Sequence, residues 1–208
     1  MPEAYGLYLV MTDPVAGYAA CAEAAVQTGV RLLQLRMKRE PRDVILRTAR
    51  EVAAIVRGSE TRFFLNDDPA LAIEAGADGV HLGQTDMPLA DARRRFPSLR
   101  GFGLSTHSEE QARAAIHCQP DYIGVGPVFP TPTKAVPDPV VGLDRLARIV
   151  SESPLPCVAI GGIDAHTLPA VLNAGARTYA VVRAVCQEPD PAAAIRRLQA
   201  IAAQFGPA

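Results

Sequence analysis

Short apolar runs alternate with longer amphipathic stretches along the whole chain of 208 residues. Each run is only a few residues long and mostly apolar, as expected for strands that are buried on both faces of a parallel sheet. The expected strands cover residues 7–11, 32–35, 63–65, 79–82, 102–104, 122–125, 157–160 and 178–182. This alternation constrains the fold more than any other feature, because repeated strand–helix units build parallel sheets.

The segments between these strands have the spacing of helices. Residues 41–56 and 191–205 repeat apolar side chains on one helical face. Ser108, with Gln111 three residues later, has the arrangement of a capping box. We expect Asp164 to cap a helix that runs to residue 172.

Eight strand–helix units in 208 residues predict an α/β protein that is a single (β/α)8 TIM barrel domain over residues 1–208. A doubly wound open sheet is the alternative. That fold would carry a glycine-rich dinucleotide loop after its first strand, and residues 12–17 (TDPVAG) lack the G-x-G-x-x-G pattern. The long connection at residues 126–141 is stiffened by prolines, which predicts a binding loop or lid.

Composition narrows the class of function. The formal net charge of −1 gives no basic excess that would attract nucleic acid. The four cysteines lie far apart and lack C-x-x-C spacing, which argues against a zinc ribbon or a thioredoxin-type pair and favours free thiols in a reducing compartment over a disulfide framework. The first residues do not resemble a signal peptide, and no apolar run approaches the roughly 18 residues of a membrane span. We therefore expect a cytoplasmic protein with small-molecule substrates, no nucleic-acid or membrane partner, and a homo-oligomer as an open option.

Polar residues gather just after the expected strands. In a TIM barrel this end of each strand faces the active site. The set comprises Gln34, Arg36, Lys38, Asn66, Asp67, Asp68, Gln84, Asp86, Ser105, His107, Thr131, Thr133, Lys134, Gly161, Gly162 and Arg183. Packing alone does not require polar residues at one end of nearly every strand, so we expect the active site there.

Asp67 and Asp86 follow neighbouring strands, and their carboxylates could converge on one hard cation such as Mg²⁺. The alternative is that one or both cap the helices that follow them. Asp68 is expected to begin its helix. His107 could act as an acid or base near neutral pH, or it could be a structural histidine.

Basic residues and glycines in the same set suit phosphate groups. Arg36, Lys38 and Lys134 could surround a pyrophosphate, although basic side chains also serve simply to solvate a surface. Gly161 and Gly162 precede a helix expected to start near Asp164, where free backbone amides would bind phosphate. The alternative is a glycine pair that only permits a tight turn.

Six segments carry a recognisable pattern in register over almost the whole chain. They are residues 34–38 (QLRMK), 66–67 (ND), 79–88 (GVHLGQTDMP), 103–107 (GLSTH), 126–134 (GPVFPTPTK) and 158–163 (VAIGGI). Together they resemble the thiamine-phosphate synthase family. The resemblance implies a (β/α)8 barrel and a transferase that joins hydroxymethylpyrimidine pyrophosphate to a thiazole phosphate. The products would be thiamine phosphate and pyrophosphate, with Mg²⁺ as cofactor.

The resemblance also implies roles for individual residues. Pyrophosphate would leave first and give a pyrimidine-methyl cation, which the thiazole nitrogen then captures. The implied metal ligands are Asp67 and Asp86, and the pyrophosphate would contact Arg36, Lys38, Asn66 and Lys134. Gln34 would hydrogen-bond the aminopyrimidine, and Ser105 would lie between the ring and the pyrophosphate. The thiazole phosphate would be bound by Thr131, Thr133, Gly162, Val182 and Arg183. Of these, Arg36, Lys38, Ser105 and Lys134 are the expected catalytic residues.

The chain departs from the family pattern at two positions. Asp68 stands where Arg is frequent, and Arg183 stands where Ser is common. Arg183 could grip the thiazole phosphate, swing outward, or indicate another phosphorylated ligand. Two other functions stay open: a thiazole tautomerase, in which His107 would transfer a proton, and a non-catalytic barrel that binds thiazole phosphate or thiamine phosphate.

Overall fold

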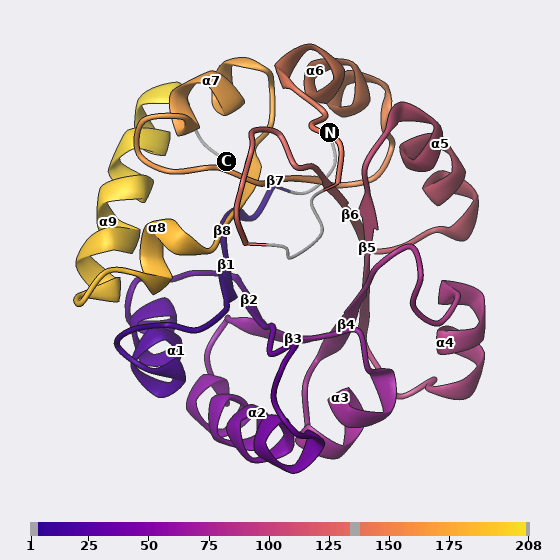
Figure 1. Cartoon of the computed structure of the whole chain (residues 1–208), viewed down its shortest axis with the longest axis vertical. Helices are drawn as coiled ribbons and strands as arrows, with labels where there is room; N and C mark the ends of the chain where they lie inside the picture. The colour runs from indigo at the N-terminus through magenta and orange to yellow at the C-terminus, as the bar shows by residue number, and fades with distance from the viewer. Residues whose placement is uncertain (1–3, 134–137, 207–208) are drawn as a thin grey trace.

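The computed structural model describes residues 4–133 and 138–206. Eight parallel strands form a closed barrel in which each strand pairs with its neighbours in chain order, and β8 pairs with β1 (Figure 1). The strands are β1 (Gly6–Met11), β2 (Leu32–Leu35), β3 (Arg62–Asn66), β4 (Gly79–Leu82), β5 (Gly101–Thr106), β6 (Tyr122–Val125), β7 (Cys157–Ile160) and β8 (Thr178–Val181). The predicted TIM barrel is confirmed, and the open doubly wound sheet is wrong.

Helices surround the barrel as a ring (Figure 1). They are α1 (Tyr18–Gln27), α2 (Arg42–Val56), α3 (Pro69–Ala75), α4 (Leu89–Arg95), α5 (Glu109–Cys118), α6 (Leu143–Glu152), α7 (Leu168–Asn173), α8 (Arg183–Cys186) and α9 (Pro191–Ala202), followed by the 3₁₀ helix η1 (Ala203–Phe205). The helix expected at 191–205 therefore tightens into 3₁₀ geometry in its last turn. No helix within the described part of the chain is long and apolar enough to cross a membrane.

The predicted start of a helix at Asp68 is confirmed, and the predicted capping box at Ser108 is confirmed in part. The Asp68 carboxylate accepts a hydrogen bond from the Leu71 amide at 2.9 Å, so Asp68 begins α3 as expected. The Ser108 hydroxyl accepts from the Gln111 amide at 3.2 Å. The return bond of the capping box is displaced by one residue, because the Gln111 side chain accepts from the amide of His107.

The predicted cap at Asp164 is wrong. α7 begins only at Leu168, with Thr167 at its N-cap position. The Asp164 carboxylate instead accepts hydrogen bonds from the amides of His166 and Thr167, at 2.8 and 3.0 Å. Asp164 thus closes a local turn before the helix, an arrangement that Asp side chains favour as readily as a helix cap.

Side chains alternate between the outer and inner faces of the barrel along each strand, and this divides the apolar residues into two clusters. Leu7, Leu9 and Met11 of β1 pack outward in the core between sheet and helices. Tyr8 and Val10 belong to a second cluster inside the barrel, which also contains Leu32, Phe64, Tyr122, Val158 and Ala180. Successive strand residues point to opposite faces, so one short strand supplies both clusters.

Aromatic rings fill the interior of the barrel. The ring of Tyr122 meets those of Tyr8 and Phe64 edge to face, with centroids 5.7 and 5.5 Å apart. Gly103 on β5 makes room for Tyr122, since a Cβ at that position would lie 2.5 Å from the Nδ1 atom of His81 and closer still to the Tyr122 ring. The packed rings fill the barrel below the carboxyl ends of its strands, and they form the base on which a ligand at this end would rest.

Candidate active site

A cavity of about 1450 Å³ opens at the carboxyl ends of the strands. Its floor is the interior cluster, because Tyr8, Val10, Tyr122, Val158 and Ala180 all line it. The wall contains each site residue predicted from the sequence within the described residues: Gln34, Arg36, Lys38, Asn66, Asp67, Asp86, Ser105, Thr131, Thr133, Gly162, Val182 and Arg183. Lys134, the remaining predicted residue, lies outside the described residues.

Asp67 and Asp86 form an acidic pair in this cavity. Asp67 has a left-handed backbone with φ of 68°, and its amide donates to the carbonyl oxygen of His81 at 2.8 Å. Burial raises the pKa of the Asp67 carboxyl, the ion pair with Lys38 opposes that rise, and the adjacent Asp86 carboxyl raises the pKa further. The two side chains therefore approach each other closely, as the sequence predicted for a shared cation.

Neither carboxylate caps a helix. Asp68 occupies the cap of α3, and Pro88 precedes α4 without a side-chain cap. The Asp86 carboxylate accepts instead from the Gly83 amide in the preceding loop, at 2.7 Å. The capping alternative is thus wrong for both residues, and the role of the pair must be sought in the cavity.

The acidic pair fits a magnesium ion only with help from other ligands. Among the residues that the structure describes, no group of three or more His, Cys, Asp or Glu side chains is arranged to hold a metal. Magnesium is commonly bound by one or two carboxylates, and water and substrate phosphates complete its shell. Two facing carboxylates meet this requirement, so the donor set suits Mg²⁺ together with a phosphate ligand.

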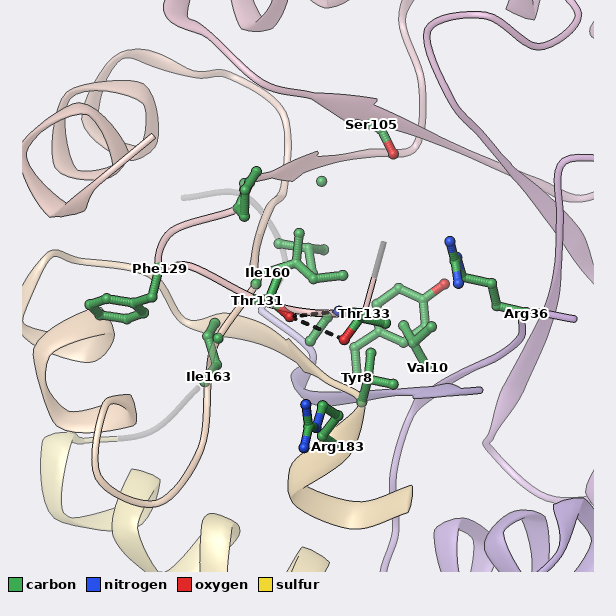
Figure 2. Close-up of a pocket in the computed structure, with 18 of the residues that line it drawn as sticks. Tyr8, Val10, Arg36, Ser105, Phe129, Thr131, Thr133, Ile160, Ile163 and Arg183 are labelled. Carbon is green, nitrogen blue, oxygen red and sulfur yellow. Dashed lines mark hydrogen bonds between the residues drawn. The ribbon is translucent and has the colours of Figure 1, made fainter. Parts of the chain in front are cut away.

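Arg36 and Lys38 place positive charge beside the acidic pair. Lys38 forms an ion pair with Asp67. Burial lowers the pKa of the Arg36 guanidinium, while the charges of Asp67 and Asp13 oppose this effect. Figure 2 shows the guanidinium of Arg36 directed into the open centre of the cavity, facing Thr133. Arg36 is half-buried and lines the cavity, which is not the setting of a side chain that merely solvates a surface.

The loop after β6 is fixed against the glycine pair that follows β7. Val128 donates to the carbonyl of Ile160 at 2.9 Å, and Phe129 donates to that of Gly161 at 3.0 Å. A Cβ on Gly162 would lie 2.7 Å from the Cβ of Phe129, so this close approach requires glycine. The expectation that a helix starts near Asp164 is wrong, because α7 begins at Leu168.

Hydroxyl groups and a guanidinium line the side of the cavity next to this loop. The hydroxyls of Thr131 and Thr133 lie 3.0 Å apart (Figure 2). Arg183 is the first residue of α8, and its Nε donates to the Gln187 side chain at 3.1 Å. Figure 2 shows Arg183 on the opposite side of the cavity from Ser105, with Thr131 and Thr133 between them. Arg183 thus lines the cavity with an exposed side chain.

His107 is held by two protein partners. Its Nδ1 lies 2.5 Å from the carbonyl oxygen of Gly126, and its Nε2 lies 3.7 Å from the carboxylate of Asp138. A carbonyl can only accept, so Nδ1 carries a hydrogen. The imidazole therefore links the beginning and the end of the long loop, which supports the structural reading of this histidine.

A group of hydrogen-bonded residues in the cavity was not predicted from the sequence. Tyr8, Tyr122 and His81 form a chain of hydrogen bonds between Gln34 and Ser105. The available signal was the polar His81 inside an expected strand of otherwise apolar residues and glycine. The two tyrosines gave no separate signal, because a tyrosine in a buried strand is typical of a core.

The model of the thiamine monophosphate synthase family matches residues 7–185 of this chain. The chain belongs to the thiamine monophosphate synthase family. A thiamine-phosphate synthase of Anaeromyxobacter dehalogenans is 42% identical over 94% of this chain and 86% of its own length. One from Methanocella arvoryzae is 41% identical over 97% of this chain and 96% of its own length.

A solved member has the same fold throughout. The thiamine phosphate pyrophosphorylase of Pyrococcus furiosus superposes with a TM-score of 0.88 and 31% identity, and the match covers 97% of each chain. The resemblance seen in the sequence is confirmed, and so is the prediction of an enzyme, since thiamine-phosphate synthases are transferases. The roles of the single residues in this family member stay predictions.

Proposed function

We propose that this chain condenses hydroxymethylpyrimidine pyrophosphate with a thiazole phosphate to give thiamine phosphate and pyrophosphate. Membership of the thiamine monophosphate synthase family supports this reaction. The observation that carries the proposal is the close pair of Asp67 and Asp86, with Lys38 and Arg36 beside them in one cavity. Such a cluster suits a group that brings several negative charges and a divalent cation together.

Asp67 and Asp86 are the residues that would hold Mg²⁺. Bound there, the ion would supply positive charge to the oxygens of the departing pyrophosphate. The raised pKa of Asp67 supports this assignment, because two half-buried carboxyls that face each other need a positive partner. Lys38 supplies part of that charge through its ion pair with Asp67.

Arg36, Lys38 and Asn66 would bind the pyrophosphate, together with Lys134 from the loop after β6. Departure of pyrophosphate leaves a cation on the pyrimidine methyl group, and no protein nucleophile is needed. Fixed positive groups stabilise the negative charge that develops on the leaving oxygens. Arg36 suits this role because its guanidinium is half-buried and can contact phosphate in bidentate fashion.

Gln34 would hydrogen-bond the pyrimidine near the cavity floor, where Gln34 is buried, and Ser105 would lie between the ring and the pyrophosphate. Thr131, Thr133, Gly162, Val182 and Arg183 would bind the thiazole phosphate on the other side of the cavity. This division would bring the thiazole nitrogen toward the pyrimidine methyl group.

The other functions considered from the sequence gain no support. A tautomerase would use His107 for proton transfer, but both of its ring nitrogens face partners within the protein. A barrel that only binds thiazole phosphate would not need the acidic pair or the cations beside it. The cytoplasmic location and a homo-oligomeric state stay predictions.

The direct test is to incubate the purified protein with both substrates and Mg²⁺ and to quantify thiamine phosphate and pyrophosphate. Both products should appear in equal amounts and require both substrates. Chelation of the metal should stop the reaction, and added Mg²⁺ should restore it. A folded protein that forms no thiamine phosphate under these conditions would refute the proposed function. Product formation unaffected by chelation would refute the metal assignment alone.

A further inference from the structure

A continuous hydrogen-bonded chain of five side chains crosses the floor of the cavity. The Gln34 amide nitrogen donates to the Tyr8 hydroxyl at 2.8 Å, and the Tyr8 and Tyr122 hydroxyls lie 2.8 Å apart. The Tyr122 hydroxyl lies 3.0 Å from Nδ1 of His81, and Nε2 of His81 lies 2.9 Å from the Ser105 hydroxyl. Gln34, Tyr8 and Tyr122 are buried. Both ends of the chain, Gln34 and Ser105, line the cavity.

The first donor determines the direction of every later bond. Tyr8 accepts from Gln34, and its single hydrogen needs an acceptor because the hydroxyl is buried. The acceptor within reach is the Tyr122 oxygen, so Tyr8 donates to Tyr122. Tyr122 then donates its own hydrogen to His81. Burial raises the pKa values of both tyrosine hydroxyls, which therefore keep their hydrogens at neutral pH.

The histidine passes this direction on to Ser105. A ring nitrogen that accepts a hydrogen bond carries no hydrogen, so neutral His81 carries its hydrogen on Nε2. Nε2 donates to the Ser105 oxygen at 2.9 Å. Since the oxygen of Ser105 already accepts this bond, its own hydrogen is left to donate to another group. Figure 2 shows the Ser105 hydroxyl directed toward the open cavity.

We propose that Tyr8 and Tyr122 are positioning residues that fix His81 as the Nε2–H tautomer and thereby make Ser105 a hydrogen-bond donor and Gln34 an acceptor toward the ligand. The ligands themselves rest on the proposed function: the Gln34 oxygen accepts from the amino group of the pyrimidine, and Ser105 donates to an oxygen of the pyrophosphate. Neither tyrosine hydroxyl touches the substrate in this arrangement; each acts through its neighbour.

The backbone of Ser105 is fixed independently of the chain. Gln84 donates from its side-chain amide to the Ser105 carbonyl oxygen at 2.5 Å. Ser105 also pairs with Gly124 in the sheet. The position of Ser105 therefore survives the loss of a tyrosine hydroxyl, and only the direction of its hydrogen bond changes. A tyrosine variant that keeps Ser105 in place but changes the direction of its hydrogen bond therefore shows a positioning effect and not a general loss of structure.

The first test reads the tautomer of His81 in the ligand-free protein by ¹⁵N NMR of the histidine rings. The spectrum is recorded near pH 8.5, above the ordinary imidazole pKa of about 6.5. The His81 signals are assigned by their absence in His81→Asn. We expect hydrogen on Nε2 and none on Nδ1. Hydrogen on Nδ1 would mean that the chain runs in the opposite direction, and it would overturn the proposal.

The second test compares Tyr122→Phe with Tyr179→Phe. Tyr179 is an equally buried tyrosine that belongs neither to the chain nor to the lining of the cavity, and its hydroxyl donates to the Leu198 carbonyl at 3.4 Å. Tyr122→Phe should mix the two His81 tautomers and lower kcat by about tenfold, the effect of one misdirected buried hydrogen bond. Tyr179→Phe should change neither the His81 tautomer nor kcat. Equal effects of the two variants, on tautomer and on kcat, would overturn the proposal.

A second variant and the NMR measurement cover the cases in which Tyr122→Phe does not fold or the wild-type protein is inactive. If Tyr122→Phe does not fold, Tyr8→Phe interrupts the same chain one bond earlier and takes its place. If the wild-type protein itself makes no thiamine phosphate, the proposed function fails, while the NMR measurement still decides whether the chain runs from Gln34 to Ser105. The two ideas can therefore fail separately.

Discussion

Replacement of Gly103 by alanine is the sharpest test of how packing supports the cavity. The added Cβ would lie 2.5 Å from Nδ1 of His81 and closer still to the Tyr122 ring. Ordinary contacts of this kind are about 3.5–4 Å, so the neighbours would have to move by about 1 Å. Tyr122 cannot easily retreat, because its ring is packed edge to face against Tyr8 and Phe64.

The expected cost follows from this overcrowding. Extra methyl groups in a packed core cost about 1–3 kcal/mol. In a protein of this length, that loss lowers Tm by roughly 2–12 °C. The displacement also separates Tyr122 from His81, so turnover should fall together with Tm. The assay is thermal unfolding followed by circular dichroism, alongside the synthase reaction.

Gly124→Ala is the matched control for this experiment. Gly124 lies on the neighbouring strand β6, and a Cβ there would meet His81 at 3.5 Å, an ordinary contact. Its Tm should remain close to that of the wild type. If Gly103→Ala unfolds at the wild-type temperature as well, the interior is not packed as tightly as the distances indicate, and the reasoning is refuted.

Three further predictions concern the charged groups. Asp67→Asn should raise Tm of the metal-free protein at neutral pH and abolish the stabilisation by Mg²⁺. The pKa of the Asp67 carboxyl is raised in the folded state, so its ionisation lowers the stability as pH rises, and this loss vanishes below the unfolded pKa of about 3.9. An unchanged Mg²⁺ response by thermal unfolding would contradict this. Arg183→Ser should raise KM for the thiazole phosphate more than KM for the pyrimidine, because Arg183 lines the cavity beside Thr131 and Thr133. A KM for the thiazole phosphate that equals the wild-type value would show that Arg183 does not bind this phosphate. Lys134→Ala should lower kcat more than it raises KM, since charge develops on the leaving pyrophosphate; steady-state kinetics with a pure KM effect would exclude that role.

The sequence predicted the centre of each strand but not always its ends. β3 begins at Arg62 and ends at Asn66, and β5 continues through Ser105 to Thr106. These end residues are polar or charged, so hydrophobicity does not reveal them. They join the sheet through backbone hydrogen bonds, which do not depend on the side chain.

Site residues could be predicted where their place at a strand end already indicated that they face the cavity. Site residues whose role depends on a contact between distant parts of the sequence were missed. Asp67 and Asp86 could be paired because each follows a neighbouring strand. Tyr8 and Tyr122 are 114 residues apart, and only closure of the barrel brings their hydroxyls together. No local pattern in the sequence reports such a contact, which is why the chain from Gln34 to Ser105 emerged only from the structure.

Packing and polarity depend on the same rings at the floor of this barrel. Phe64 fills the space that Gly79 and Gly101 leave open, where a Cβ would lie 2.6 and 2.8 Å from its ring. The rings of Tyr8 and Tyr122 pack against Phe64 with centroids 6.4 and 5.5 Å apart, and their hydroxyls reach the polar chain. A phenylalanine in place of either tyrosine would keep the packing and lose the direction of the chain. A leucine would lose both, so only the phenylalanine variants can separate what the rings contribute to the fold from what the hydroxyls contribute to the ligand.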